Sequence, residues 1–126
     1  MTKTQYDSAS FSKSPAGKIR EINERYALTV GDIAGVLDVA TKTITRWTKS
    51  KKSESTLSAQ KKDRLAVLES ILKLGKKVLG SDKELNRWLH SPIFSLDGKK
   101  PIEMIKTESG RRRVEEVLHQ IEYGIY

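Results

Sequence analysis

Apolar residues recur at spacings of three and four along most of the chain beyond residue 17, with polar residues between them. This period is typical of amphipathic α-helices, and no stretch shows the strict alternation of a half-buried β-strand. The pattern therefore predicts an all-α protein. Residues 1–16 are rich in Ser, Thr and Lys and show no sustained period. We expect them to form a flexible arm.

Turn-forming and capping residues divide the pattern into separate helices. We predict a first helix from about Gly17, two short helices over "TVGDIAGVL" and "TKTITRWTK", and a long helix from about Leu57 to Leu79. After Gly80, Ser81 and Glu84 begin another helix, Pro101 a short one, and Ser109 caps the last.

The segment "KSKKSEST" contains no apolar residue and is expected to be a linker between two parts. The predicted organisation is an arm at residues 1–16, a unit at 17–50, a linker at 51–56 and a helical domain at 57–126. With no apolar residue joining their cores, we expect the two main parts to move independently.

The first part has the sequence features of a helix-turn-helix. Small or apolar residues stand where two short helices must cross or face a small core: Ile33, Ala34, Leu37, Val39, Ile44 and Trp47. The stretch "LTVGDIAGVLDVATKTITRW" resembles the DNA-binding helix-turn-helix of Xre-like bacterial regulators. Asp38 stands at the turn, where that family usually has glycine. Aspartate tolerates the left-handed backbone better than most residues, so we expect the turn to be kept.

The exposed side of the second short helix carries the predicted DNA-binding residues Thr41, Lys42, Thr43, Thr45, Arg46 and Lys49. Spacings of three, four and seven place most of them on one stripe. Arginine can bond guanine with two hydrogen bonds, threonine offers a hydroxyl and a methyl group, and lysine neutralises phosphate. The alternative is that this stripe is only the solvated face of a small bundle.

The second part carries an ordered set of motifs: Trp88–Leu89, Leu96–x–Gly98, Pro101, Thr107–Glu108–x–Gly110, Val114, Leu118 and Ile121–Glu122–Tyr123–Gly124. This set resembles the toxin-binding domain of Xre/MbcA/ParS-type antitoxins. The resemblance implies a homodimeric antitoxin that binds its own operator DNA and neutralises a cognate toxin. In many such pairs the toxin has a RES domain that attacks NAD. The alternative is a stand-alone dimeric transcriptional regulator without a toxin partner.

The end of the chain is unusually apolar, with Tyr123, Gly124, Ile125 and Tyr126. Tyrosine is favoured at interfaces because it combines a large apolar ring with a polar tip. The resemblance implies that this end lies against the active-site region of the toxin, and we predict these four residues to be toxin-binding. The alternative, that the tail folds onto its own core, stays open.

The composition narrows the remaining function classes. Lys and Arg number 24 against 16 Asp and Glu, a net charge of +8 that favours anionic partners such as nucleic acid. The chain has no cysteine and only two histidines, His90 and His119. No cluster of acidic residues occurs at a sequence spacing typical of metal ligands. We therefore expect no catalytic activity, no cofactor and no metal site. No apolar run approaches the ~18–20 residues that span a bilayer. The absence of cysteine fits a cytoplasmic protein, and we expect no membrane contact. The alternative is that residues 57–79 form a basic amphipathic helix that lies on a membrane.

Overall fold

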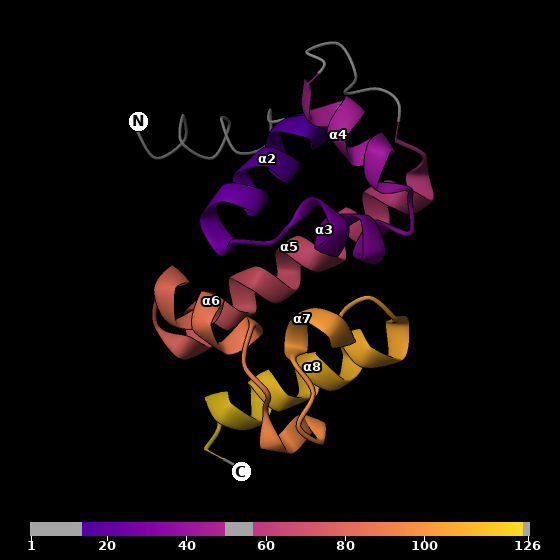
Figure 1. Ribbon diagram of the computed structural model, residues 1–126. Coiled ribbons are helices and arrows are strands. Elements are labelled where there is room, and N and C mark those ends of the chain that lie inside the picture. The colour runs from indigo at the N-terminus through magenta and orange to yellow at the C-terminus, as the bar shows by residue number, and fades with distance from the viewer. Residues whose placement is uncertain (1–13, 50–56, 125–126) are drawn as a thin grey trace.

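The computed structural model describes residues 14–49 and 57–124 of the chain (Figure 1). Within these ranges the elements are α2 (Pro15–Tyr26), α3 (Val30–Leu37), α4 (Thr41–Lys49), α5 (Ala59–Leu79), α6 (Asp82–Leu89), η1 (Phe94–Leu96), α7 (Pro101–Met104) and α8 (Glu108–Glu122). These ranges hold no β-strand, only an isolated bridge between Ile93 and Lys99. The predicted all-α class is confirmed. The predicted arm, apart from Ser14–Ala16, and the linker lie outside the described residues.

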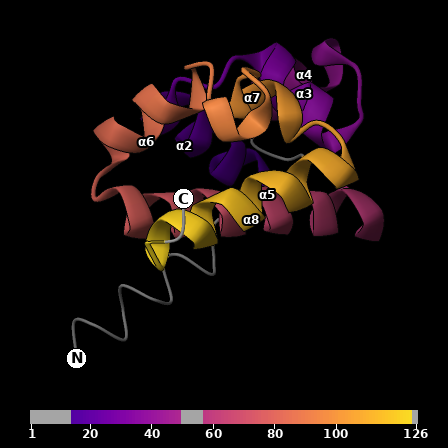
Figure 2. The same ribbon diagram turned by 90° about the horizontal axis from the view of Figure 1, so that it is seen from below.

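The long helix α5 forms the centre of the structure. Figure 1 shows α2, α3 and α4 on one side of α5 and α7 and α8 on the other, and Figure 2 shows α8 running alongside α5. Leu65, Leu68 and Ile71 of α5 are at most 3% exposed. Gly75 lies on the same buried face of α5, and a Cβ added there would lie 2.5 Å from a methyl carbon of Leu85. Glycine at this point therefore allows α6 to pack closely on α5.

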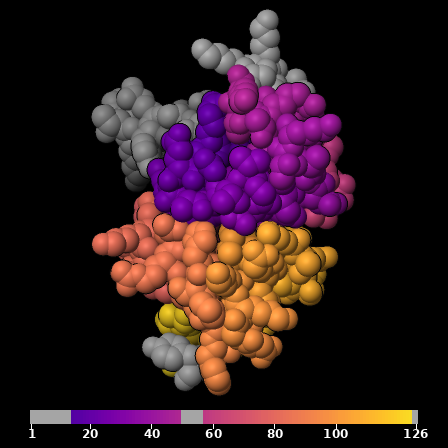
Figure 3. Space-filling model, viewed as in Figure 1, coloured from indigo at the N-terminus to yellow at the C-terminus, as the bar shows by residue number. Residues whose placement is uncertain are grey.

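The two predicted parts share one hydrophobic core. A single cluster of buried side chains runs from Ile19 and Leu37 in the first part to Leu89 and Leu118 in the second. Helix α3 packs against α5, and α2 packs against α6. Figure 3 shows the two parts meeting along a continuous boundary. The predicted residue bounds and the relative motion of the two parts stay predictions, but the expectation that no apolar residue joins their cores is wrong.

Side-chain caps fix several helix ends where the sequence placed them. The amide N–H of Asp32 donates to Thr29 Oγ1 and that of Thr29 donates to Asp32 Oδ2, both at 3.0 Å, so the capping box of α3 is complete. The amide N–H of Glu84 donates to Ser81 Oγ at 3.1 Å at the start of α6. These bonds satisfy amide groups that the first turn of a helix leaves without a partner.

The predicted cap of the last helix is wrong. Helix α8 is capped by Thr107, whose Oγ1 accepts from the amide N–H of Gly110 at 3.0 Å, and Ser109 lies inside the first turn. The reason is the packing of Gly110 on the end of α7. A Cβ at this position would lie 1.8 Å from the carbonyl oxygen of Met104. The start of α8 is therefore set by the close contact of Gly110 with the backbone of Met104.

Candidate nucleic-acid and protein-binding surfaces

A tight turn joins α3 to α4, as the sequence predicted. Asp38 has φ 60° and ψ 52°, the left-handed conformation expected for this position. Its backbone N–H donates to the carbonyl oxygen of Ala34. From α5, Lys61 Nζ donates to the carbonyl oxygen of Asp38 at 2.9 Å and lies 3.9 Å from its carboxylate. The long helix therefore holds the turn in place.

Helix α4 has one buried face and one exposed face. Ile44 is fully buried and Trp47 is 5% exposed, so Trp47 belongs to the core as expected. On the other face Thr41, Lys42, Arg46 and Lys49 are exposed, while Thr43 and Thr45 are half-buried. The structure thus brings the six predicted DNA-binding residues onto one helix, with their three cations open to solvent.

Hydrogen bonds at α4 refine the predicted roles. The hydroxyl of Thr45 donates to the carbonyl oxygen of Thr41 at 3.2 Å, which leaves its oxygen and its methyl group for an outside contact. Arg20 of α2 donates from Nη1 to the carbonyl oxygen of Thr48 at 2.9 Å. A cation is favourable at the carboxyl end of a helix because the carbonyl oxygens carry partial negative charge there. Arg20 was missed by the sequence analysis, because it lies 28 residues from Thr48 in sequence.

At the other end of the chain, Tyr123 is 69% exposed and follows the last turn of α8. Its ring stacks on that of His119, with ring centres 6.2 Å apart and planes 11° apart. Gly124 follows with φ 72°, so the backbone leaves the helix in a left-handed conformation. Ile125 and Tyr126 lie outside the described residues. Tyr123 and Gly124 are therefore presented at the surface rather than packed in the core.

The carboxylate of Glu122 fixes the end of α8. Lys77 Nζ of α5 lies 3.1 Å from Glu122 Oε2, and His119 Nδ1 lies 3.2 Å from Oε1. The hydrogen bond from Lys77 and then that from His119 lower the pKa of Glu122 below its usual value. The last turn of α8 is held on α5 close to Tyr123.

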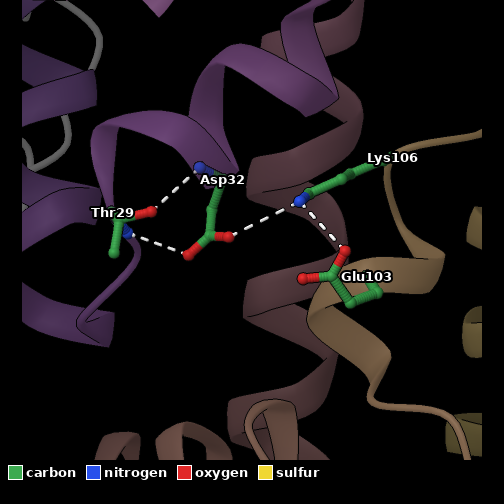
Figure 4. Close-up of polar contacts among 4 residues, drawn as sticks. All are labelled: Thr29, Asp32, Glu103 and Lys106. Carbon is green, nitrogen blue, oxygen red and sulfur yellow. Dashed lines mark hydrogen bonds and ion pairs between the residues drawn. The ribbon is translucent and has the colours of Figure 1, made fainter.

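Lys106 joins the two parts of the molecule (Figure 4). Its Nζ lies 3.7 Å from Oδ1 of Asp32, in the capping box of α3, and 3.1 Å from Oε1 of Glu103 in α7. The stem of Lys106 passes over Gly35, where an added Cβ would lie 2.9 Å from its Cδ. The start of α3 and the turn after α7 are therefore linked by both charge and packing.

Two arginines bond the carboxyl ends of helices near this junction. Arg64 of α5 donates to the carbonyl oxygen of Val36 at 3.4 Å, and Arg111 of α8 donates to that of Ile105 at 3.1 Å. Burial lowers the pKa of Arg111, and the nearby charge of Arg64 lowers it further. Arg64 thus holds the carboxyl end of α3 on α5, and Arg111 holds the end of α7 on α8.

The comparisons with known proteins agree with this geometry. Residues 74–124 match the family model described as the antitoxin Xre/MbcA/ParS C-terminal toxin-binding domain. This part of the chain is similar to the Xre/MbcA/ParS-type domain. The resemblance inferred from the sequence motifs is thereby confirmed.

Two relatives extend the comparison. An "Antitoxin Xre" of Pseudomonas putida (strain KT2440) is 34% identical over 68 residues, which are 54% of this chain and 43% of that protein. The match thus spans less than half of the relative. A chain of the crystal structure of the M. tuberculosis MbcT-MbcA toxin-antitoxin complex superposes with a TM-score of 0.64 at 22% identity. It covers 88% of this chain and 96% of that one, which shows a shared fold.

No group of three or more His, Cys, Asp or Glu side chains in residues 14–49 and 57–124 could hold a metal ion. None of the described helices is both long enough and apolar enough to cross a membrane.

Proposed function

We propose that this chain is the antitoxin of a type II toxin–antitoxin pair, which binds and neutralises a cognate toxin and represses its own operon as a homodimer. The observation that carries the proposal is the match of residues 74–124 to a toxin-binding domain. That domain shares its core with a helical unit that exposes a basic helix face. A protein with two such surfaces can link toxin binding to transcription.

The DNA-binding half of the proposal rests on α4. Lys42, Arg46 and Lys49 are exposed on one face while Ile44 and Trp47 anchor the opposite face. Arg20 adds a further cation beside the end of this helix. In a dimer, two such helices would read half-sites about one turn of DNA (~34–36 Å) or a multiple apart. The net charge of +8 supports binding to the phosphate backbone.

The toxin-binding half rests on the matched domain and on the surface at the end of α8. Tyr123 is 69% exposed although it is aromatic, and it leads into the apolar residues Ile125 and Tyr126. We assign Tyr123–Tyr126 to the toxin interface. That the toxin has a RES domain and attacks NAD follows from the family resemblance alone.

Co-expression with the adjacent reading frame tests the proposal. The neighbouring product should arrest growth and lower cellular NAD when expressed alone, and this chain should restore both and co-purify with it. A neighbouring product that arrests growth without changing NAD would keep the antitoxin role and reject the RES assignment. Operator binding without any co-purifying protein or rescue of growth would instead favour the stand-alone regulator.

A further inference from the structure

Phe94 is the most exposed large apolar side chain in the described part of the molecule. It is 96% exposed, compared with 69% for Tyr123 and 41% for Val67. Its neighbour Leu96, in the same 3₁₀ turn, is 1% exposed. The two apolar side chains of the turn thus point in different directions. Leu96 is buried in the core, and Phe94 projects into solvent.

The backbone around Phe94 is held by a closed set of hydrogen bonds. Ile93 N–H donates to the carbonyl oxygen of Lys99 at 3.1 Å, and Gly98 N–H donates to that of Ile93 at 2.9 Å. Asp97 N–H donates to the carbonyl oxygen of Phe94 at 3.0 Å. Asp97 and Gly98 both have positive φ, 59° and 77°, which closes the loop tightly. Little backbone entropy would be lost if the ring of Phe94 became buried in a complex.

Helix α8 adds a further support to this turn. Arg113 donates from Nη2 to the carbonyl oxygen of Ser95 at 2.8 Å, and from Nη1 to Glu116 at 2.8 Å. The residue next to Phe94 is thus attached directly to a helix of the matched domain. Aromatic side chains on a rigid backbone are common anchors of protein interfaces. Binding then costs little conformational entropy, because only the two side-chain torsions of the ring become fixed.

The position of Phe94 points to the protein partner rather than to DNA. It lies inside residues 74–124, the segment that matches the toxin-binding domain. Figure 1 shows η1 and the carboxyl end of α8 at the end of the molecule opposite α4. A toxin that contacts Phe94 and Tyr123 would therefore leave the basic face of α4 free.

A second copy of this chain is the alternative partner for the ring. In a two-fold contact the same patch must supply both the projecting ring and the hole that receives it. The cleft nearest in sequence to the turn, of about 470 Å³, is lined by Lys99, Lys100, Glu103, Met104, Thr107, Ser109 and Gly110, and its wall is mainly apolar. A ring from a second copy could enter such a cleft, so the sedimentation mass of the free protein has to separate self-association from toxin binding.

We propose that Phe94 is an aromatic anchor that inserts into an apolar pocket on the toxin, and this rests on the proposed antitoxin function. Exposed Lys99 and Lys100 follow the turn, while Asp97 is its exposed carboxylate. The pocket should accordingly carry carboxylates on its rim, which would pair with these lysines. Interface aromatics at the centre of such a contact supply much of its affinity.

The test uses the full chain and, as the probe, the product of the adjacent reading frame in a catalytically inactive form. Affinity is measured by calorimetry for the wild type, Phe94→Ala, Phe94→Leu and the control Val67→Ala, which removes an exposed side chain outside the matched segment. The melting temperature, the sedimentation mass and operator binding of each free variant are measured as well. Because the ring is 96% exposed, none of these three should change.

Phe94→Ala should weaken toxin binding about 30-fold, Phe94→Leu less, and Val67→Ala less than threefold. If the wild type binds the toxin and the affinity of Phe94→Ala is within threefold of it, the anchor proposal is overturned and the antitoxin function is kept. A change from dimer to monomer in free Phe94→Ala would overturn it in favour of self-association. A wild-type chain that binds no neighbouring product would overturn the proposed function, and the anchor with it.

Discussion

Lys106 Nζ lies 3.7 Å from Asp32 Oδ1, so a residue of the segment that matches the family model contacts the capping box of the first helix of the predicted helix-turn-helix. The two side chains are 29% and 15% exposed, and Glu103 shares the same ammonium group. The contact is one of the points at which the basic helical unit is fixed on the rest of the core. The contact can contribute to the free energy of unfolding through the ion pair and through packing, because the aliphatic stem of Lys106 also covers Gly35. Substitutions of Lys106 can separate the two contributions.

We expect Lys106→Met to lower the free energy of unfolding by about 0–1 kcal/mol, the usual range for partly exposed ion pairs. Methionine keeps an apolar stem over Gly35, whereas Lys106→Ala removes the stem too and should cost more. Urea unfolding measures both variants. A Lys106→Met variant as unstable as Lys106→Ala would show that charge rather than packing dominates the junction.

Gly110→Ala should strongly destabilise the fold. The added Cβ would lie 1.8 Å from the carbonyl oxygen of Met104, and a backbone atom cannot move aside as a flexible side chain can. We expect a loss of about 1–3 kcal/mol or more, read from the urea midpoint.

Gly31→Ala is the matched control for this substitution. Gly31 is also helical but exposed, and the nearest atom to an added Cβ is Thr29 Oγ1 at 3.6 Å. This variant should be neutral or more stable by about 0.5–1 kcal/mol, because alanine favours the helix. Equal destabilisation of the two variants would contradict the close approach of α7 and α8.

Arg46→Ala should cost roughly 1–3 kcal/mol of operator affinity if its guanidinium reads a base. Lys49→Ala should instead weaken binding to all sequences alike and reduce the salt dependence by about one unit. The control is Lys73→Ala, an exposed lysine on α5 away from this face. Operator affinity measured over a salt series distinguishes the three. If Arg46→Ala binds operator DNA with unchanged affinity, α4 does not lie in the major groove as predicted.

The pair of Glu122 with Lys77 should make stability depend on pH at the acid side. The folded chain lowers the pKa of Glu122, so the contribution is present above its ordinary value of 4.5 and is lost as the pH falls through the lowered value. Glu122→Gln should therefore unfold with less change between about pH 5 and pH 3 than the wild type, as measured by melting temperature. An identical acid dependence in both proteins would mean that other carboxylates account for it.

The sequence predicted best what depends on neighbours three or four residues apart. The capping box of Thr29 and Asp32, the left-handed Asp38 and the buried Trp47 all follow from such local patterns. The cap of α8 was misplaced by two residues because it depends on the contact of Gly110 with α7. That contact comes from tertiary packing, which a local pattern does not contain.

Long-range relationships were beyond the sequence analysis for the same reason. The bond from Arg20 to Thr48 and the pair of Lys106 with Asp32 join residues that only the fold brings together. The shared core was not predicted, because the polar linker at residues 51–56 suggested two separate cores. In the structure α5, which follows the linker, packs against α3 on one side and α8 on the other, and so joins the two parts. The exposure of Phe94 could not be inferred either, since an apolar residue in a turn is as readily an anchor in the core, as Leu96 is.

Removal of Gly124, Ile125 and Tyr126 tests the predicted role of the carboxyl end. Tyr123 is 69% exposed, and its N–H already bonds the carbonyl oxygen of His119 at 3.0 Å, so the end of α8 does not depend on Gly124 for this contact. The truncated chain should keep its melting temperature and its operator affinity. It should lose neutralisation, because aromatic anchors at an interface centre can each contribute about 2 kcal/mol or more.

The full-length variant Tyr126→Ala serves as the companion to the truncation, since it keeps the backbone and removes only one ring. If the tail binds the toxin, it should lose part of the toxin affinity with no change in melting temperature. If the tail packs on the chain's own core, both changes should lower the melting temperature even without a partner. A lowered melting temperature together with unchanged toxin affinity would assign Tyr126 to the core and leave the toxin interface to the surface that carries Phe94.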